Sequence, residues 1–314
     1  MTGKPLRSQS LNEPSTIRCG TAADWCLRIV ILLQCIGLSG KYVFSRRESE
    51  SDVYGYLFFD YGWPEQLAQR IDDGGAIACL IAGVIVMLIG TWGWRGRSIG
   101  RAQLRTPVVG CIDHVALATV FAWFLIISFT HMLRGEPFAS LSLGEHAVRY
   151  CAAAALSLLL MHSTSISRAG DLGQPWAMRL LVIASAATFV VHGYKAVLRY
   201  SPFTDLILLT DMNMTGIGLS QSTAESALVV IGIIDILVAA LLMLSRCAGF
   251  ALYRSFALYM VFWGCLTSLS RVTAYGWEAW PETLIRAANW GAPLAIVIYD
   301  GWTTTMNTKQ DSMG

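Results

Sequence analysis

Eight long apolar runs constrain this chain more than any other feature of its sequence. Each run has roughly the 20 residues that an α-helix needs to cross the hydrocarbon core of a bilayer. The runs lie at residues 25–44, 75–94, 113–133, 146–163, 176–196, 226–245, 250–270 and 284–302. A lipid-embedded segment must satisfy its own backbone polar groups, so the runs predict helices. We therefore expect an all-α, polytopic membrane protein with eight transmembrane helices. The lipid bilayer is the first partner that this class implies.

The composition supports the same class. Only 14% of the residues are charged and 54% are hydrophobic, whereas about 25% charged residues are usual in soluble domains. The net charge is only +2, and the basic residues are scattered between the apolar runs, so we predict no nucleic-acid partner. The eight cysteines contain no C-x-x-C pair. Free cysteines in apolar segments are usually small buried residues, so we predict no disulfide framework.

The positions of Lys and Arg predict the orientation. Short cytoplasmic connections keep an excess of these residues. The informative examples are Lys4, Arg7 and Arg18 before the first run, Arg95, Arg97, Arg101 and Arg105 after the second, and Arg246 after the sixth. The connection after the first run is mainly acidic. We expect both termini in the cytoplasm, with cytoplasmic tails at residues 1–23 and 304–314 and a cytoplasmic linker at residues 164–175.

The two halves of the chain resemble each other. Trp25–Val30 matches Trp176–Leu181, and Glu145–Arg149 matches Glu282–Arg286. One deletion in a second-half connection reconciles the two matches. Because each half holds four runs, both halves have the same orientation. The expected parallel four-helix repeats span residues 24–163 and 176–303.

Each matched Glu and Arg stand four residues apart, a spacing that puts both on one face of a helix. The helix dipole favours the carboxylate at the N-terminus. We therefore expect Glu145 and Glu282 to begin long helices and to pair with Arg149 and Arg286. On this interpretation, replacing either Arg by Ala lowers thermal stability.

Further polar residues map to the same outer end. Lys41 and Lys195 end the first run of each half, where each can snorkel to the interface or face the Glu of its own half. The candidate outer-leaflet ligand pocket comprises Lys41, Glu145, Arg149, His192, Lys195, Glu282 and Arg286. At the inner end, Arg28 and Arg179 are expected to snorkel as anchors.

Asp235 is the acidic residue that this topology places near the middle of the bilayer, about 14 Å from the start of its run. An Asp side chain cannot reach the interface from there. It is either a protonated group bonded to a neighbouring helix or the proton site of a proton-coupled transporter.

The spacing of the other polar residues indicates no metal, cofactor or catalytic site. The five histidines show no haem or zinc ligand pattern, so no metal is predicted and the cofactor stays unknown. No nucleophile with a base, phosphate loop or dinucleotide fingerprint is visible. Enzymatic activity is left open.

Each half also combines an Arg early in its first run with a Gly and a Lys near the end of that run, as in Gly40-Lys41 and Gly193-Tyr194-Lys195. This layout resembles the DoxX-like family of bacterial integral membrane proteins. On that resemblance Asp235 stands where the family carries an acid, whereas the first half has Val84 to Val86 there. The resemblance implies the bacterial cytoplasmic (inner) membrane and a redox-associated subunit with a membrane redox partner or a small, quinone-like ligand. A non-catalytic structural or assembly subunit is the other alternative.

Overall fold

The protein is a helical bundle. The computed structural model describes residues 14–44, 51–98, 107–135, 137–164, 173–245 and 250–311. Within these ranges it contains helices and no strand, so the all-α prediction is confirmed. The long helices are α1 (Pro14–Ser39), α3 (Glu65–Ser98), α4 (Pro107–Leu133), α6 (Ala147–Thr164), α7 (Gly173–Val197), α9 (Gln221–Ser245), α10 (Phe250–Tyr275) and α12 (Ala287–Asp311). Each of the predicted runs overlaps one of these helices.

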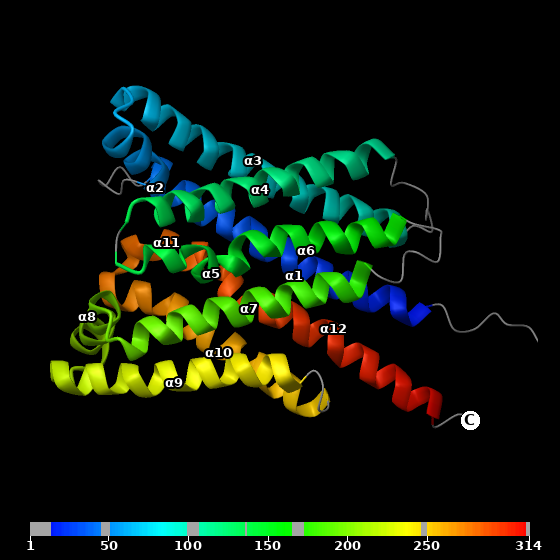
Figure 1. Ribbon diagram of the computed structural model, residues 1–314. Coiled ribbons are helices and arrows are strands. Elements are labelled where there is room, and N and C mark those ends of the chain that lie inside the picture. The colour runs from blue at the N-terminus through cyan, green and yellow to red at the C-terminus, as the bar shows by residue number, and fades with distance from the viewer. Residues whose placement is uncertain are drawn as a thin grey trace, which may run out of the picture.

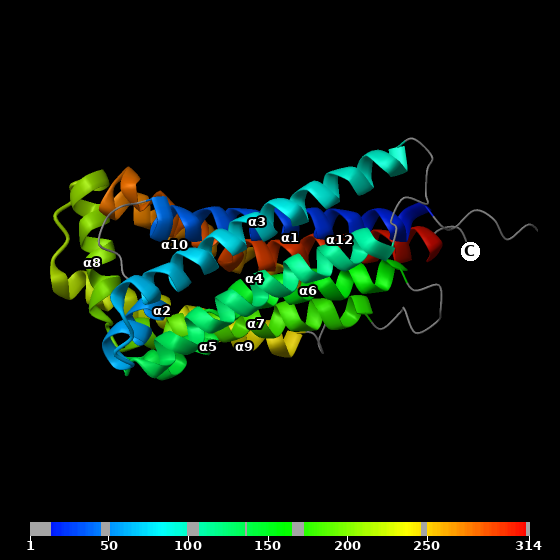
Figure 2. The same cartoon turned by 90° about the horizontal axis from the view of Figure 1, so that it is seen from above.

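Short elements gather at one end of the bundle. They are η1 (Gly40–Phe44), α2 (Asp52–Gly55), η2 (Tyr56–Asp60), η3 (Ala139–Leu141), α5 (Ser142–Glu145), α8 (Ser201–Thr210), η5 (Asp211–Thr215), η6 (Trp277–Ala279) and α11 (Trp280–Ile285). Figure 1 shows α2, α5, α8 and α11 towards the left, and we call this the cluster end. Helix α1 begins and α12 ends at the right, which we call the terminal end (Figures 1 and 2).

Five segments of the described chain are long and apolar enough to cross a membrane. They are Ala22–Phe44, Glu65–Trp92, Val108–Leu133, Trp176–Val197 and Gln221–Ser245. Together they give the chain the character of a membrane protein. Helices α6, α10 and α12 are not among the five, so the eight-span arrangement stays a prediction.

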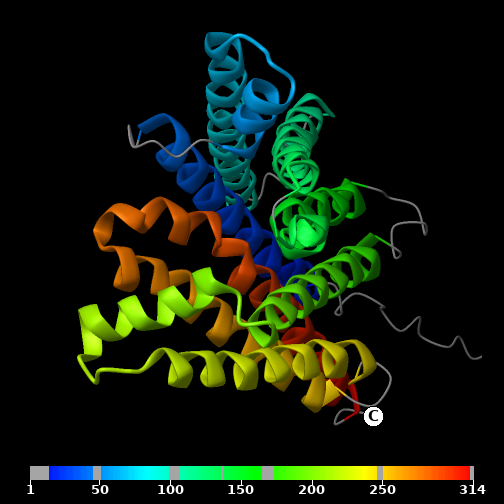
Figure 3. The same ribbon diagram turned by 60° about the vertical axis from the view of Figure 1, so that its left-hand side comes forward.

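The long helices divide into interior and peripheral ones. More than half of the apolar window in α1 and α7 is buried, 56% and 61%, against 33% in α3 and α9. Figure 3 shows α1 and α12 near the centre of the bundle, where they pack against each other. The peripheral helices expose large apolar side chains such as Ile81, Val115, Leu237 and Phe262. Water would disfavour such a surface, whereas lipid accepts it.

The interior contacts run between the two parts of the chain. Helix α6 packs against α7 and α12 packs against α1, while α5 contacts α7 and α11 contacts α1.

Where α7 crosses α9, the backbones approach so closely that a Cβ on Gly232 would lie 2.5 Å from the carbonyl oxygen of Gly193. Only glycine fits at this crossing, as at many helix contacts in membranes.

The segments predicted as tails are partly helical in the described part of the chain. Residues 14–23 belong to α1, and α12 continues to Asp311, so the predicted tail from residue 304 is mostly helix. Residues 1–13, 165–172 of the predicted linker, and 312–314 lie outside the described residues.

Candidate functional site

The structure brings the seven predicted pocket residues to the cluster end. Lys41 lies in η1, Glu145 in α5, Arg149 in the first turn of α6, His192 and Lys195 in the last turns of α7, Glu282 in α11, and Arg286 just after it. Ion pairs and electrostatic contacts connect all seven. We call this set the charge cluster.

The ion pairs of the charge cluster join one half of the chain to the other. Lys195 Nζ lies 2.5 Å from Glu145 Oε2, and His192 Nε2 lies 3.5 Å from Glu145 Oε1. Lys41 Nζ lies 3.3 Å from Glu282 Oε1. Of the two alternatives for the lysines, a contact of each Lys with the Glu of its own half is therefore wrong. The reason is that α5 packs on α7, and α11 packs on α1.

The predicted start of two long helices at Glu145 and Glu282 is also wrong. Glu145 ends α5, and the backbone at His146 (φ −100°, ψ 9°) departs from helical values before α6 begins. Arg286 (φ −85°, ψ 6°) breaks the chain in the same way between α11 and α12. The break comes directly after Glu145 but four residues after Glu282, so the two matched segments differ in backbone conformation.

Because of the break at His146, Arg149 does not form the predicted ion pair with Glu145. Glu145 pairs with Lys195 and His192 instead of with Arg149. Only the second predicted pair forms, with Arg286 Nη1 3.4 Å from Glu282 Oε2. Arg149 is therefore left without the carboxylate that the four-residue spacing assigns to it.

The two carboxylates outside the spans are strongly acidic. Burial disfavours the ionised form of Glu145, but the hydrogen bond with His192 and the charges of His146, His192 and Lys195 outweigh it and lower its pKa far below the ordinary value. Burial likewise opposes ionisation of Glu282, yet the charges of Lys41, Arg286 and Arg271 lower its pKa to about 2. Both side chains are ionised at neutral pH.

Three guanidinium groups converge beside these carboxylates. Arg149 interacts electrostatically with Arg286 and Arg271, and Arg271 interacts with Arg286. We call these three residues the guanidinium cluster. The Nε atoms of Arg149 and Arg271 are buried and have no hydrogen-bond partner in the described part of the chain. Neither residue has a carboxylate within ion-pair distance there, whereas Arg286 has Glu282.

Arg271 is the residue that sequence reasoning missed. It follows the seventh apolar run, where it reads as a connection residue that does not discriminate between the two sides of the membrane. In the structure it lies in the last turns of α10, half-buried. The sequence feature that could have identified Arg271 is its position just after an apolar run that ends at the cluster end.

Asp52, another acidic residue at the same end, already has its own partners. Asp52 lies 3.0 Å from His131 Nδ1 and 3.3 Å from Arg134 Nη1. Burial opposes its ionisation, but these two partners lower its pKa below the ordinary value. Asp52 therefore does not compensate the guanidinium cluster.

The prediction that Arg28 snorkels to the membrane surface as an anchor is wrong. Arg28 is fully buried, with Nε 2.6 Å from Asp24 and Nη2 2.8 Å from Asp113, and it also donates to the carbonyl of Val86. A Cβ on Gly90 would lie 2.7 Å from Arg28 Cδ, so glycine makes room for the side chain. The guanidinium thus links α1, α3 and α4. A buried charge needs such partners, which is why Arg28 does not reach the surface.

The hydrogen bonds of Asp235 go to α10 and not to the charge cluster. Asp235 is buried in α9 and accepts a 3.0 Å hydrogen bond from the Tyr259 hydroxyl of α10. The Trp263 side chain also bonds to it. These contacts match the interpretation of a polar contact between neighbouring helices.

We expect Asp235→Asn to change the free energy of unfolding by less than about 1 kcal/mol, because the amide oxygen can still accept from Tyr259. Asp235→Leu should cost about 1–3 kcal/mol, since it leaves a buried hydroxyl unpaired. Adding Tyr259→Phe should recover part of that loss. Denaturant unfolding in detergent measures all three. An Asn variant as unstable as the Leu variant would contradict this role, and loss of proton-driven flux at unchanged stability would favour a transporter.

The described residues hold no group of three or more His, Cys, Asp or Glu that would bind a metal ion. No protein-family model, characterised protein or solved structure matches this chain. Function is therefore inferred from the chemistry of the site. Carboxylates paired with lysines beside guanidinium groups that they compensate only partly are suited to binding an anion.

Proposed function

We propose that the protein is a DoxX-like membrane protein of two parallel four-helix repeats that binds a small anionic ligand at the cluster end. The observation that carries the proposal is the convergence of Arg149, Arg271 and Arg286. Two of them have buried Nε atoms with no hydrogen-bond partner among the described residues. The proposed orientation puts both termini in the cytoplasm of a bacterium and the cluster end in the outer leaflet of the inner membrane.

Two features support the repeats. The order of elements from α1 to α6 recurs from α7 to α12, with short elements after the first and third long helices of each set. Helices α1 and α7 both begin at the terminal end, as parallel repeats require (Figure 1). An axis that relates the two sets would also relate the α6–α7 contact to the α12–α1 contact.

The balance of charge supports an anion as the ligand. Like charges held together in a half-buried site repel each other unless a counter-charge is present. Glu145 and Glu282 are held by Lys195 and Lys41 and so compensate the guanidinium cluster only partly. A bound oxyanion supplies the missing charge.

The geometry of guanidinium narrows the ligand class. Its planar set of N–H donors matches carboxylate, phosphate and sulfate groups, and can donate to two oxygens of one such group at once. A quinone oxygen accepts the same hydrogen bonds but leaves the positive charge uncompensated. We therefore propose that the ligand is an oxyanion. A redox subunit that binds a quinone is the alternative, and the same experiment detects it.

The test is saturable binding of oxyanions to the purified protein in detergent. Sodium phosphate, sulfate and succinate are titrated against sodium chloride at equal ionic strength, and melting is followed by tryptophan fluorescence. A ligand that binds only the folded state stabilises it by about 2.7 kcal/mol at one hundred times its Kd. Arg149→Gln should weaken binding of the preferred anion by about tenfold or more, because hydrogen bonds to charged groups contribute roughly 1.5–3 kcal/mol.

Arg199→Gln is the matched control. Arg199 lies at the same end, 60% exposed and 3.9 Å from Glu225, and should leave affinity unchanged. Without ligand, Arg149→Gln should not lower the melting temperature, because it removes a like charge rather than a paired one. Equal anion affinity in the Arg149 variant would refute the proposal. Binding of a short-chain benzoquinone, with no oxyanion exceeding chloride, would favour the redox subunit.

A further inference from the structure

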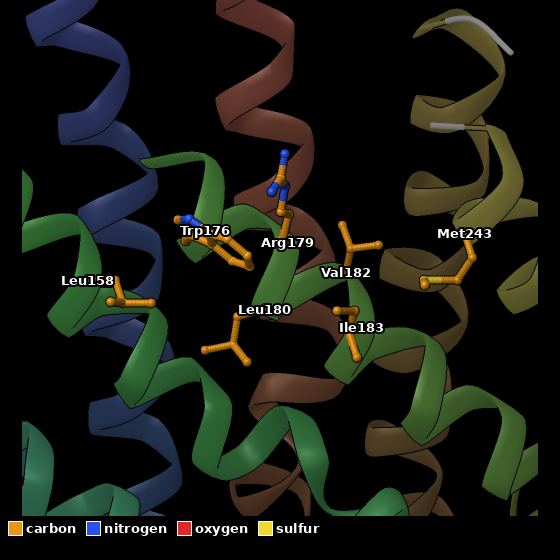
Figure 4. Close-up of a pocket in the computed structure, with 7 residues that line it drawn as sticks. All are labelled: Leu158, Trp176, Arg179, Leu180, Val182, Ile183 and Met243. Carbon is orange, nitrogen blue, oxygen red and sulfur yellow. The ribbon is translucent and has the colours of Figure 1, made fainter. Parts of the chain in front are cut away.

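An apolar groove lies at the terminal end, far from the charge cluster. It encloses about 490 Å³ between α6, α7 and α9. Figure 4 shows its walls, formed by Leu158, Trp176, Leu180, Ile183 and Met243, with Arg179 beside them. Trp176, Ile183 and Met243 are 54%, 55% and 44% exposed, so the groove opens on the outer surface of the bundle. On a membrane-spanning helix such a surface faces lipid.

Arg179 gives this groove a charged end. It is exposed, and its guanidinium lies 4.9 Å from the centre of the Trp176 ring. No carboxylate lies within ion-pair distance of it in the described part of the chain. Arg179 stands three residues inside the apolar segment that begins at Trp176, or about 5 Å along the helix. That depth is where headgroups meet acyl chains, and where Trp and Arg side chains are favoured.

Arg28 and Arg179 differ in their surroundings, because among the described residues only Arg28 has carboxylate partners. The two arginines occupy matching positions in the two sequence segments that begin at Trp25 and Trp176. Arg28 is enclosed and paired with Asp24 and Asp113. Arg179 has an aromatic ring on one side and an apolar groove beside it, so a ligand for this place needs an anionic group joined to an apolar chain.

We propose that the groove binds an anionic phospholipid from the leaflet at the terminal end. One acyl chain lies along Leu180, Ile183 and Met243, and the phosphate pairs with Arg179. Basic side chains at the membrane surface attract anionic lipid by about 1 kcal/mol each. The apolar walls give a bilayer lipid an advantage over a soluble anion, which has no chain to bury.

Native mass spectrometry of the detergent-purified protein, with phosphatidylglycerol or phosphatidylcholine added in mixed micelles, tests the proposal. The wild type should retain one phosphatidylglycerol more tightly than phosphatidylcholine. Arg179→Gln should weaken that retention by about fivefold, the equivalent of about 1 kcal/mol. Arg254→Gln is the matched control, because Arg254 is exposed at the same end but does not line the groove.

A second variant tests the apolar part. Ile183→Trp should fill the groove and reduce retention of both lipids, while an unchanged melting temperature shows that the protein is folded. Equal losses in the Arg179 and Arg254 variants would mean diffuse surface attraction and would overturn the site. So would equal retention of the two lipids in the wild type, or an unaltered phosphatidylglycerol affinity in Arg179→Gln.

Discussion

Arg28→Met should destabilise the protein by about 3–5 kcal/mol, the cost of removing one partner from a buried ion pair. Methionine has about the length of the arginine stem but carries no charge. It would leave Asp113, whose side chain is 2% exposed, and Asp24, at 14%, without the guanidinium that balances them. Equilibrium unfolding in mixed detergent micelles measures the loss.

Arg179→Met is the matched control for Arg28, since the two residues hold the same place in matching segments. Its side chain is exposed and has no carboxylate partner among the described residues, so it should change stability by less than about 0.5 kcal/mol. Adding Asp113→Leu to Arg28→Met should recover part of the loss, because an apolar replacement of the whole pair is tolerated. Similar effects of the two single Met variants would show that Arg28 is not buried in the native protein.

Glu145→Gln should destabilise the protein by about 3 kcal/mol, because it leaves the Lys195 ammonium uncompensated. The Lys195 side chain is only 4% exposed, and its remaining neighbours are rings, with Tyr200 5.0 Å and Phe138 5.9 Å from Nζ. These cation–π contacts offset part of the loss. Glu225→Gln is the control, since its partner Arg199 is exposed and 3.9 Å away. We expect less than about 0.5 kcal/mol there.

Acid should reproduce the Glu145→Gln result. The pKa of Glu145 is lowered on folding from the ordinary 4.5, so its contribution is fully present above pH 4.5. It is lost as the pH falls below that value towards the folded pKa. Unfolding measured from pH 7 downwards should therefore show a shallower loss in Glu145→Gln than in wild type. The remaining acid sensitivity should include Glu282, between pH 4.5 and about 2. A parallel loss in both proteins would contradict the pairing.

The helical class and the position of the long helices were predictable from sequence. In lipid, a helix hydrogen-bonds its own backbone groups, so whether a run forms a spanning helix depends on its length and apolarity. Both are local properties of the sequence. The same argument located the charged residues at run ends, so the seven members of the charge cluster were named before their contacts were known. Local spacing was a poorer guide to partners. The four-residue interval between Glu145 and Arg149 predicts an ion pair only in an unbroken helix, and the chain breaks at His146.

The sequence by itself determined that this chain forms apolar helices with charged residues at their ends. Only the tertiary structure decided which of those charges are balanced. Lys195 reaches Glu145 because α5 packs on α7, and Arg28 is enclosed because Asp113 comes from another helix. Arg271 joins Arg149 and Arg286 because the start of α6 and the ends of α10 and α11 meet at one place. Such neighbours are far apart in the chain, and the distance between two charges, which sets their interaction energy, is defined only when the helices pack.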